Sequence, residues 1–117
     1  MVLMTPHDPV LICSKRKDTT GRPISWNQMS KIGNEYKLTV GFYTYFAIVE
    51  LKDIWICEDI RDITNVTARR LGYKDKHTYL AQPYNLNNPD FRRKMHEFEL
   101  VEDNLMNFMK EYTKVKK

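Results

Sequence analysis

The chain of 117 residues is 42% apolar and 29% charged, which is the composition of a globular protein with one modest core. No apolar run approaches the roughly 20 residues that a membrane-spanning helix requires, and the first residues lack the basic start and long apolar stretch of a secretory signal. At this length we expect one domain over residues 1–117, and the hydropathy predicts no membrane partner. Because Cys13 and Cys57 lie far apart without a CxxC spacing, we expect reduced thiols rather than a disulfide, and therefore a cytoplasmic protein.

The excess of positive charge, +4 overall, lies in two separate blocks. Residues 1–45 carry six cations and three acids, and residues 67–96 carry seven cations and two acids. The segments 46–66 and 97–117 are net negative. If the fold brings the two basic blocks together, they form one basic face for an anionic partner; otherwise they are two solvated surfaces.

The first half of the chain predicts a loop followed by two strands. A short apolar element, Val10–Cys13, leads into the basic stretch Lys15–Arg22 (KRKDTTGR), which we expect to be a loop. Pro23–Gly33 contains several turn formers. The run Tyr36–Cys57 is rich in β-branched and aromatic residues, and Gly41 should divide it into two strands.

The second half begins with two predicted helices. Asp62 or Thr64 can cap a helix that ends at Gly72, where glycine tolerates the left-handed conformation. A second helix is expected over Lys74–Gln82, and the proline after it begins a predicted loop, Pro83–Asp90.

After this loop we expect a helical turn at Phe91–Met95, a strand at Glu97–Val101 and a final helix. The final segment has acids before it and lysines at its end, which suits a helix dipole. Its apolar residues at helical spacing are Leu105, Met106, Phe108, Met109 and Tyr112. This helix should pack on the core, with the binding of a protein partner as the alternative. Because no regular helical crossovers join the strands, the element order favours an α+β fold with a mostly antiparallel sheet or small barrel.

The stretch KRKDTTGR carries the residues best suited to ligand binding. Alternate positions of an extended segment point to one side, so Thr20 and Arg22 can share a face with Lys17 at its beginning. Arginine offers a planar fork for a phosphate or a base edge, and a lysine beside a hydroxyl can polarise a substrate oxygen. The alternative is a basic loop that is simply solvated.

The same stretch resembles the motif G-x-K-x-x-[E/T]-x-R of the ASCH family, whose members are small β-barrels related to the PUA RNA-binding fold. Lys17, Thr20 and Arg22 match its lysine, Glu/Thr position and arginine, whereas Lys15 stands where the family has glycine. Three further stretches resemble the family's entry into a strand, its central strand and the helix after that strand: IGNEYKL, FAIVELKDIWI and DITNVTARRLGY. The resemblance covers residues 10–101 and implies a mostly antiparallel PUA-like barrel with short flanking helices and a C-terminal helix.

The resemblance also implies a basic cleft that holds RNA, other single-stranded nucleic acid or a modified nucleoside. Arg69 and Arg70 would lie opposite the motif across this cleft. Trp26, Tyr43 and Tyr45 are candidates for stacking on unpaired bases, although each can instead pack in the core. The motif would contribute Lys15, Arg16, Lys17, Thr20 and Arg22.

Some ASCH proteins of similar size are amidohydrolases of N4-acetylcytidine, which use the motif's lysine and threonine with a glutamate on the helix after the central strand. Lys17 and Thr20 are present here, but the predicted helix 65–72 has no glutamate. Glu50 can replace it only if its side chain faces the cleft. We therefore expect binding rather than catalysis.

No metal or cofactor is expected. His7, His77 and His96 lack a ligand spacing such as HxxxH, and the chain has neither a GxxxxGK[ST] nor a GxGxxG loop. The run Arg92–Lys94 should be a solvated charge cluster. Three functions follow in order of preference: nucleic-acid binding, hydrolysis of a modified nucleoside, and binding of a protein partner through the C-terminal helix.

Overall fold

The computed structural model describes residues 2–116, with side chains up to residue 114. Within this range, five strands form one sheet in the order β1-β3-β4-β5-β2. β1 runs parallel to β3, and the other neighbouring strands are antiparallel. The strands are β1 (Val2–Leu3), β2 (Thr19–Arg22), β3 (Glu35–Thr39), β4 (Ala47–Cys57) and β5 (Arg93–Asp103). The helices are α1 (Asp8–Cys13), α2 (Asn65–Arg70), α3 (Lys76–Leu80), α4 (Pro83–Asn87) and α5 (Leu105–Lys116), with a 3-10 turn at Ile60–Asp62.

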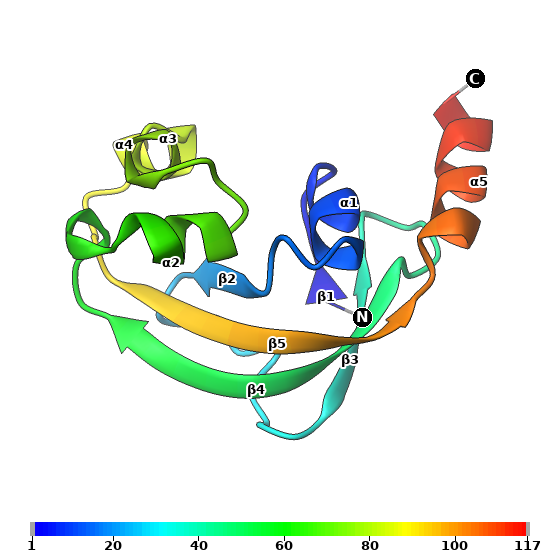
Figure 1. Cartoon of the computed structure of the whole chain (residues 1–117), viewed down its shortest axis with the longest axis horizontal. Coiled ribbons are helices and arrows are strands. Elements are labelled where there is room, and N and C mark those ends of the chain that lie inside the picture. The colour runs from blue at the N-terminus through cyan, green and yellow to red at the C-terminus, as the bar shows by residue number, and fades with distance from the viewer. Residues whose placement is uncertain (1, 117) are drawn as a thin grey trace.

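The long antiparallel pair of β4 and β5 sets the shape of the sheet. Register shifts between Ile48 and Val49 and between Leu51 and Asp53 bend β4, so the sheet curls into a half-barrel. The helices α1, α2, α3 and α4 gather on the concave side of this curved pair (Figure 1). The predicted α+β fold with a mostly antiparallel, barrel-like sheet is therefore confirmed.

Two apolar clusters hold the helices on the sheet, since burial of apolar surface is the main favourable term in folding. The larger cluster joins the strands to α1 and α5, and its members include Leu38, Phe46, Leu51, Phe98 and Phe108. The smaller cluster packs α2 and α3 on β5, and its members include Ala68, Leu71, Tyr79 and Met95.

The capped helix and the final helix occur where the sequence predicts them. Thr64 caps α2 by accepting a hydrogen bond from the Thr67 amide at 3.1 Å, and Gly72 follows the helix with a φ of 97°. α5 packs on the larger cluster through Phe108. No helix within residues 2–116 is both long enough and apolar enough to cross a bilayer.

Three local predictions are wrong. The basic stretch predicted as a loop ends in β2, which pairs with β5. The predicted loop Pro83–Asp90 begins with α4, because proline suits the first turn of a helix, where its missing amide is not needed. In place of the predicted helical turn Phe91–Met95, β5 begins at Arg93. Pairing with β4 from Arg93, and with β2 from Lys94, overrides the local preference.

Arg93 also contradicts the predicted solvated cluster, because it is only 1% exposed. Its guanidinium donates to the carbonyls of Asp90 and Arg92 at 2.6 and 2.7 Å, and to Asn85 Oδ1 at 3.0 Å. It also lies 4.9 Å from the ring centroid of Tyr84. This buried arginine therefore fastens α4 to the start of β5.

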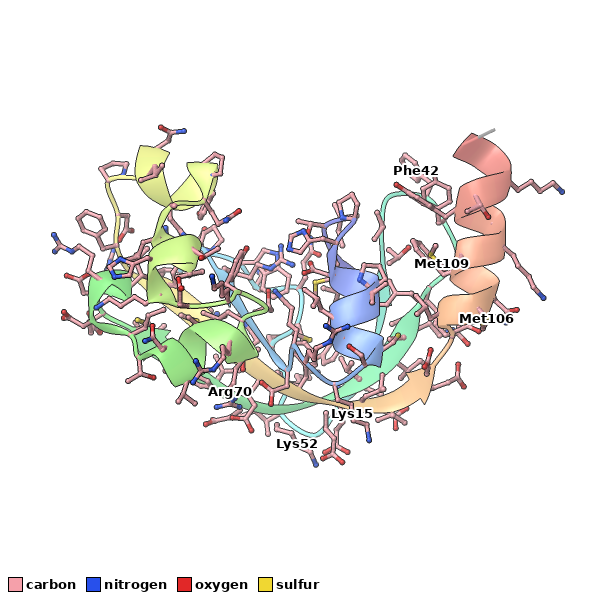
Figure 2. The ribbon with its side chains drawn as sticks, turned by 45° about the horizontal axis from the view of Figure 1, so that its top comes forward. Lys15, Phe42, Lys52, Arg70, Met106 and Met109 are labelled. Carbon is pink, nitrogen blue, oxygen red and sulfur yellow. The ribbon has the colours of Figure 1, made fainter. Side chains whose placement is uncertain are left out.

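Helix α5 carries exposed apolar residues. Met106 and Met109 lie on this helix, and Phe42 lies near it at the same end of the molecule (Figure 2). Phe42 is fully exposed. The binding of a protein partner through α5 stays a prediction.

Candidate ligand-binding site

The three matched motif residues line one cavity. Lys17, Thr20 and Arg22 face a hollow of about 330 Å³ between β2, the start of α1, the segment after α2, and α4. Thr20 and Arg22 reach it as alternate residues of β2, in agreement with their spacing. Gly21 lies between them, and a Cβ there would come within 3.3 Å of the Tyr79 hydroxyl oxygen. Glycine at this position therefore allows α3 to pack closely on β2.

Lys17 and Asp8 form a buried ion pair in the cavity lining. Lys17 Nζ lies 3.3 Å from Asp8 Oδ1 and donates a hydrogen bond to the Leu71 carbonyl at 2.8 Å. Lys17 is 6% exposed and Asp8 is 2% exposed. The amide and the hydroxyl of Thr5 both donate to Asp8 Oδ2, at 3.0 and 2.9 Å.

The pKa values of Lys17 and Asp8 are shifted by burial and by their neighbours in different ways. Burial lowers the pKa of Lys17, and the attraction to Asp8 opposes this shift without cancelling it. Burial alone would raise the pKa of Asp8, but Lys17 and the Thr5 donors together lower it. Asp8 is therefore held as a carboxylate by several groups, whereas the charge on Lys17 depends mainly on Asp8.

The backbone after α2 closes over Lys17 because residue 72 is glycine. Gly72 has a φ of 97°, which residues with a side chain rarely adopt. A Cβ at this position would lie 3.1 Å from Lys17 Cδ and 3.2 Å from Leu11 Cδ1. The close approach places the Leu71 carbonyl within reach of the lysine ammonium.

Arg22 is positioned by contacts outside the cavity. Its Nη2 donates to the Leu3 carbonyl and contacts Met4 Sδ, both at 3.1 Å. Its guanidinium lies 4.9 Å from the ring centroid of Trp26, which meets the ring of His96 edge-on. Burial lowers the pKa of His96 to about 4, so this ring is neutral near pH 7. Trp26, predicted to stack on a base, instead stacks on Arg22 and does not line the cavity.

Two tyrosines that were not predicted supply the aromatic part of the lining. Tyr73 follows Gly72, and its ring packs on that of Tyr79 at 5.2 Å between centroids. Tyr84 lies on α4, is half-exposed and is held against the guanidinium of Arg93. The walls of the cavity therefore combine polar groups with aromatic rings.

Tyr43 and Tyr45, which were predicted to stack on bases, lie at the α5 end of the molecule. Tyr43 packs edge-on against Phe108, with 5.9 Å between ring centroids. Tyr45 donates a hydrogen bond to Glu102 at 2.6 Å. Neither tyrosine lines the cavity, because the connection between β3 and β4 that carries them packs beside α5.

The arginines of α2 do not face the motif residues across this cavity. Arg70 forms ion pairs with Asp18 and Glu97, at 3.0 and 2.9 Å. Arg69 lies beside a different hollow together with Arg16. Successive residues of a helix point about 100° apart, so α2 cannot direct both arginines to one place.

Lys15 and Glu50 also lie away from the cavity. Lys15 is exposed, and with Arg70 and Lys52 it lies at the lower edge of Figure 2, far from α4. Glu50 forms an ion pair with Lys52 at 2.9 Å and does not line the cavity. The charged residues that line the cavity are Lys17, Arg22 and Asp8, with His7 beside them. This lining is not the densely basic cleft that the sequence predicted.

Asp8, Tyr73 and Tyr84 were missed for different reasons. Asp8 had one local signal, the spacing Thr5-x-x-Asp8 ahead of an apolar run, which is the capping-box pattern of a helix start. The two tyrosines had none, because each follows a turn former and reaches the cavity only through the packing of α2, α3 and α4.

No protein-family model matches the chain, and no curated protein matches it. Its fold is similar to those of several solved structures. The ASCH domain from Lactobacillus crispatus JV V101 aligns with a TM-score of 0.66 and 14% identity, over 79% of this chain and 69% of that one. A DUF984 protein from Enterococcus faecalis V583 aligns with a TM-score of 0.63 and 22% identity, over 84% and 69%. ASCH from Zymomonas mobilis aligns with a TM-score of 0.54 and 13% identity, over 87% and 66%.

The chain therefore has an ASCH-like fold, as the motif resemblance predicted. At these identities the similarity defines the fold, and function has to be argued from the site.

Proposed function

We propose that this protein binds single-stranded nucleic acid, RNA above all, by taking one base, ordinary or modified, into the cavity. The observation that carries the proposal is that Lys17, Thr20 and Arg22 line one cavity with Tyr73 and Tyr84 in its wall. The volume of about 330 Å³ falls within the range of small-molecule sites. The ASCH-like fold adds support by analogy only.

The lining suits a base better than a phosphate. The Lys17 ammonium is already bound to Asp8 and to the Leu71 carbonyl. The buried Asp8 carboxylate would repel a phosphate strongly in such a weakly screened place. An unpaired base is neutral, stacks on aromatic rings and offers hydrogen-bonding edges, which Thr20 and Arg22 can meet.

Fluorescence anisotropy with labelled single-stranded RNA homo-oligonucleotides of the four bases tests this proposal. Tyr84→Ala should weaken binding about 5- to 150-fold, which corresponds to the ~1–3 kcal/mol of one base–aromatic stack. Tyr84→Phe keeps the ring and should retain the affinity. Leu86→Ala, which changes an exposed residue of the same helix outside the cavity lining, is the matched control.

Two outcomes contradict the proposal. If neither these homo-oligonucleotides nor a single-stranded RNA containing N4-acetylcytidine binds, the function itself is rejected. If RNA binds and folded Tyr84→Ala and Thr20→Val both bind as tightly as the wild type, the cavity is not the site.

The ion pair favours a second candidate function, hydrolysis of an N4-acetylated cytidine. Asp8, 3.3 Å from Lys17 Nζ, offers the carboxylate that α2 lacks. In this reaction water adds to the acetyl carbonyl, the bond to N4 breaks, acetate leaves, and N4 takes up a proton. Release of acetate from N4-acetylcytidine, followed by proton NMR, should be lost in Thr20→Val. If the wild type releases no acetate, this candidate is rejected and the binding proposal stands.

A further inference from the structure

A second hollow adjoins the first cavity at the segment after α2. It has a volume of about 430 Å³, and Tyr73 lines both hollows. Its other lining residues are Leu11, Arg16, Arg69, Gly72 and Lys74. One of its cations comes from the first basic block of the sequence and two come from the second. The two blocks therefore meet here, beside the cavity rather than inside it.

The three cations of this hollow form no salt bridge within the described residues, although Arg16 Nε donates to Ser14 Oγ at 3.1 Å and Lys74 lies next to Asp75 in the chain. Arg16, Arg69 and Lys74 are exposed, and none of them forms an ion pair with any side chain in the described part of the chain. By contrast, the exposed Arg61 and Arg92 each pair with a nearby aspartate, at 2.6 and 3.1 Å. Unpaired cations around a concave surface attract an anion, and the guanidinium fork matches a phosphate.

We propose that this second hollow holds the phosphate attached to the nucleotide whose base occupies the first cavity. The inference rests on the proposed function and refines its ligand to a nucleotide within a strand, rather than a free nucleoside. The charges of the two hollows favour different parts of the nucleotide. The carboxylate of Asp8 disfavours a phosphate in the first cavity, whereas the three cations favour a phosphate in the second hollow. Only a sugar separates a base from its phosphate, and Tyr73 lines both hollows.

The salt dependence of RNA binding tests the inference. The best-binding homo-oligonucleotide is measured between about 50 and 200 mM salt for the wild type, Arg69→Gln and Lys74→Gln. Loss of one phosphate contact should reduce the slope of log K against log salt by about 0.7 for a single strand. Lys110→Gln, which removes an exposed and unpaired lysine from α5 within the described side chains, is the matched control and should leave the slope unchanged.

Binding of the matching free nucleoside, measured by titration calorimetry, separates this inference from the proposed function. The inference is supported if Arg69→Gln and Lys74→Gln both reduce the slope of log K against log salt and both bind the free nucleoside as tightly as the wild type does. Slopes equal to that of Lys110→Gln would overturn the phosphate site while leaving the base cavity in place. If inorganic phosphate competes with the free nucleoside, phosphate enters the first cavity and the proposed division of tasks is wrong.

Discussion

Replacing Asp8 by asparagine removes a buried charge while keeping the size of the side chain, and it should destabilise the fold by about 3–5 kcal/mol near neutral pH. The ammonium of Lys17, 6% exposed, would keep only the Leu71 carbonyl among its described partners. Thr5 could still donate to the asparagine oxygen, but without the added strength that a charged acceptor provides.

Removal of the other partner, by Lys17→Met, should lower the free energy of unfolding by less, about 1–2 kcal/mol. Methionine can fill the space of the lysine stem under Gly72. The Asp8 carboxylate keeps its two hydrogen bonds from Thr5. In the double variant Asp8→Asn/Lys17→Met no buried charge remains, so its cost should be smaller than the sum of the two single costs.

The loss of unfolding free energy caused by Asp8→Asn should also become smaller as the pH rises. Burial lowers the pKa of Lys17 below its value in the unfolded chain, about 10.4, and loss of Asp8 lowers it further. Between these two pKa values the unfolded chain binds more protons than the folded one, so the free energy of unfolding increases with pH. The variant therefore recovers part of its stability in the alkaline range up to about pH 10.

Urea denaturation followed by circular dichroism measures each of these free energies near pH 7 and again near pH 9. A loss below about 1 kcal/mol for Asp8→Asn near neutral pH would refute the argument that Lys17 depends on this carboxylate. A greater loss for Lys17→Met than for Asp8→Asn would refute it as well.

Three further predictions concern packing and reactivity. Gly72→Ala should lower the free energy of unfolding by at least about 1 kcal/mol more than Gly33→Ala does. Both glycines have a positive φ, but of the two only Gly72 has other atoms near an added Cβ, the nearest at 3.1 Å. Equal denaturation midpoints would contradict this prediction. Arg93→Met should cost about 2–3 kcal/mol because it leaves buried acceptors without a donor, whereas Lys94→Met should cost less, and thermal unfolding of both variants provides the comparison. Burial raises the pKa of Cys13 to about 12, so Ellman's reagent should modify this thiol slowly in the native protein near neutral pH and quickly in urea; rapid native modification would contradict this reasoning.

Local sequence patterns predicted the elements whose stabilising interactions are also local. The β-prone run up to Cys57 forms β3 and β4, and Thr64 and Gly72 bound a helix because capping and φ preferences act within a few residues. The apolar spacing from Leu105 onward likewise predicted α5.

Predictions failed where distant residues decide the outcome. Arg93 starts a strand because it pairs with Cys57 of β4, and its side chain is buried against Asn85 and Tyr84 of α4. No nearby residue in the sequence signals these contacts. Arg70 points toward Asp18 and Glu97 rather than toward the cavity, since these acids reach it from β5 and from the segment before β2.

For the site, the sequence by itself determined that Thr20 and Arg22 share one side, because a strand alternates its side chains with a period of two. Only the tertiary structure decided that Asp8 meets Lys17, that Tyr73 and Tyr84 form the wall, and that the two basic blocks meet beside the cavity. The physical reason is that charge pairing and burial depend on which surfaces pack together, and the curl of the sheet sets that packing, whereas local periodicity does not.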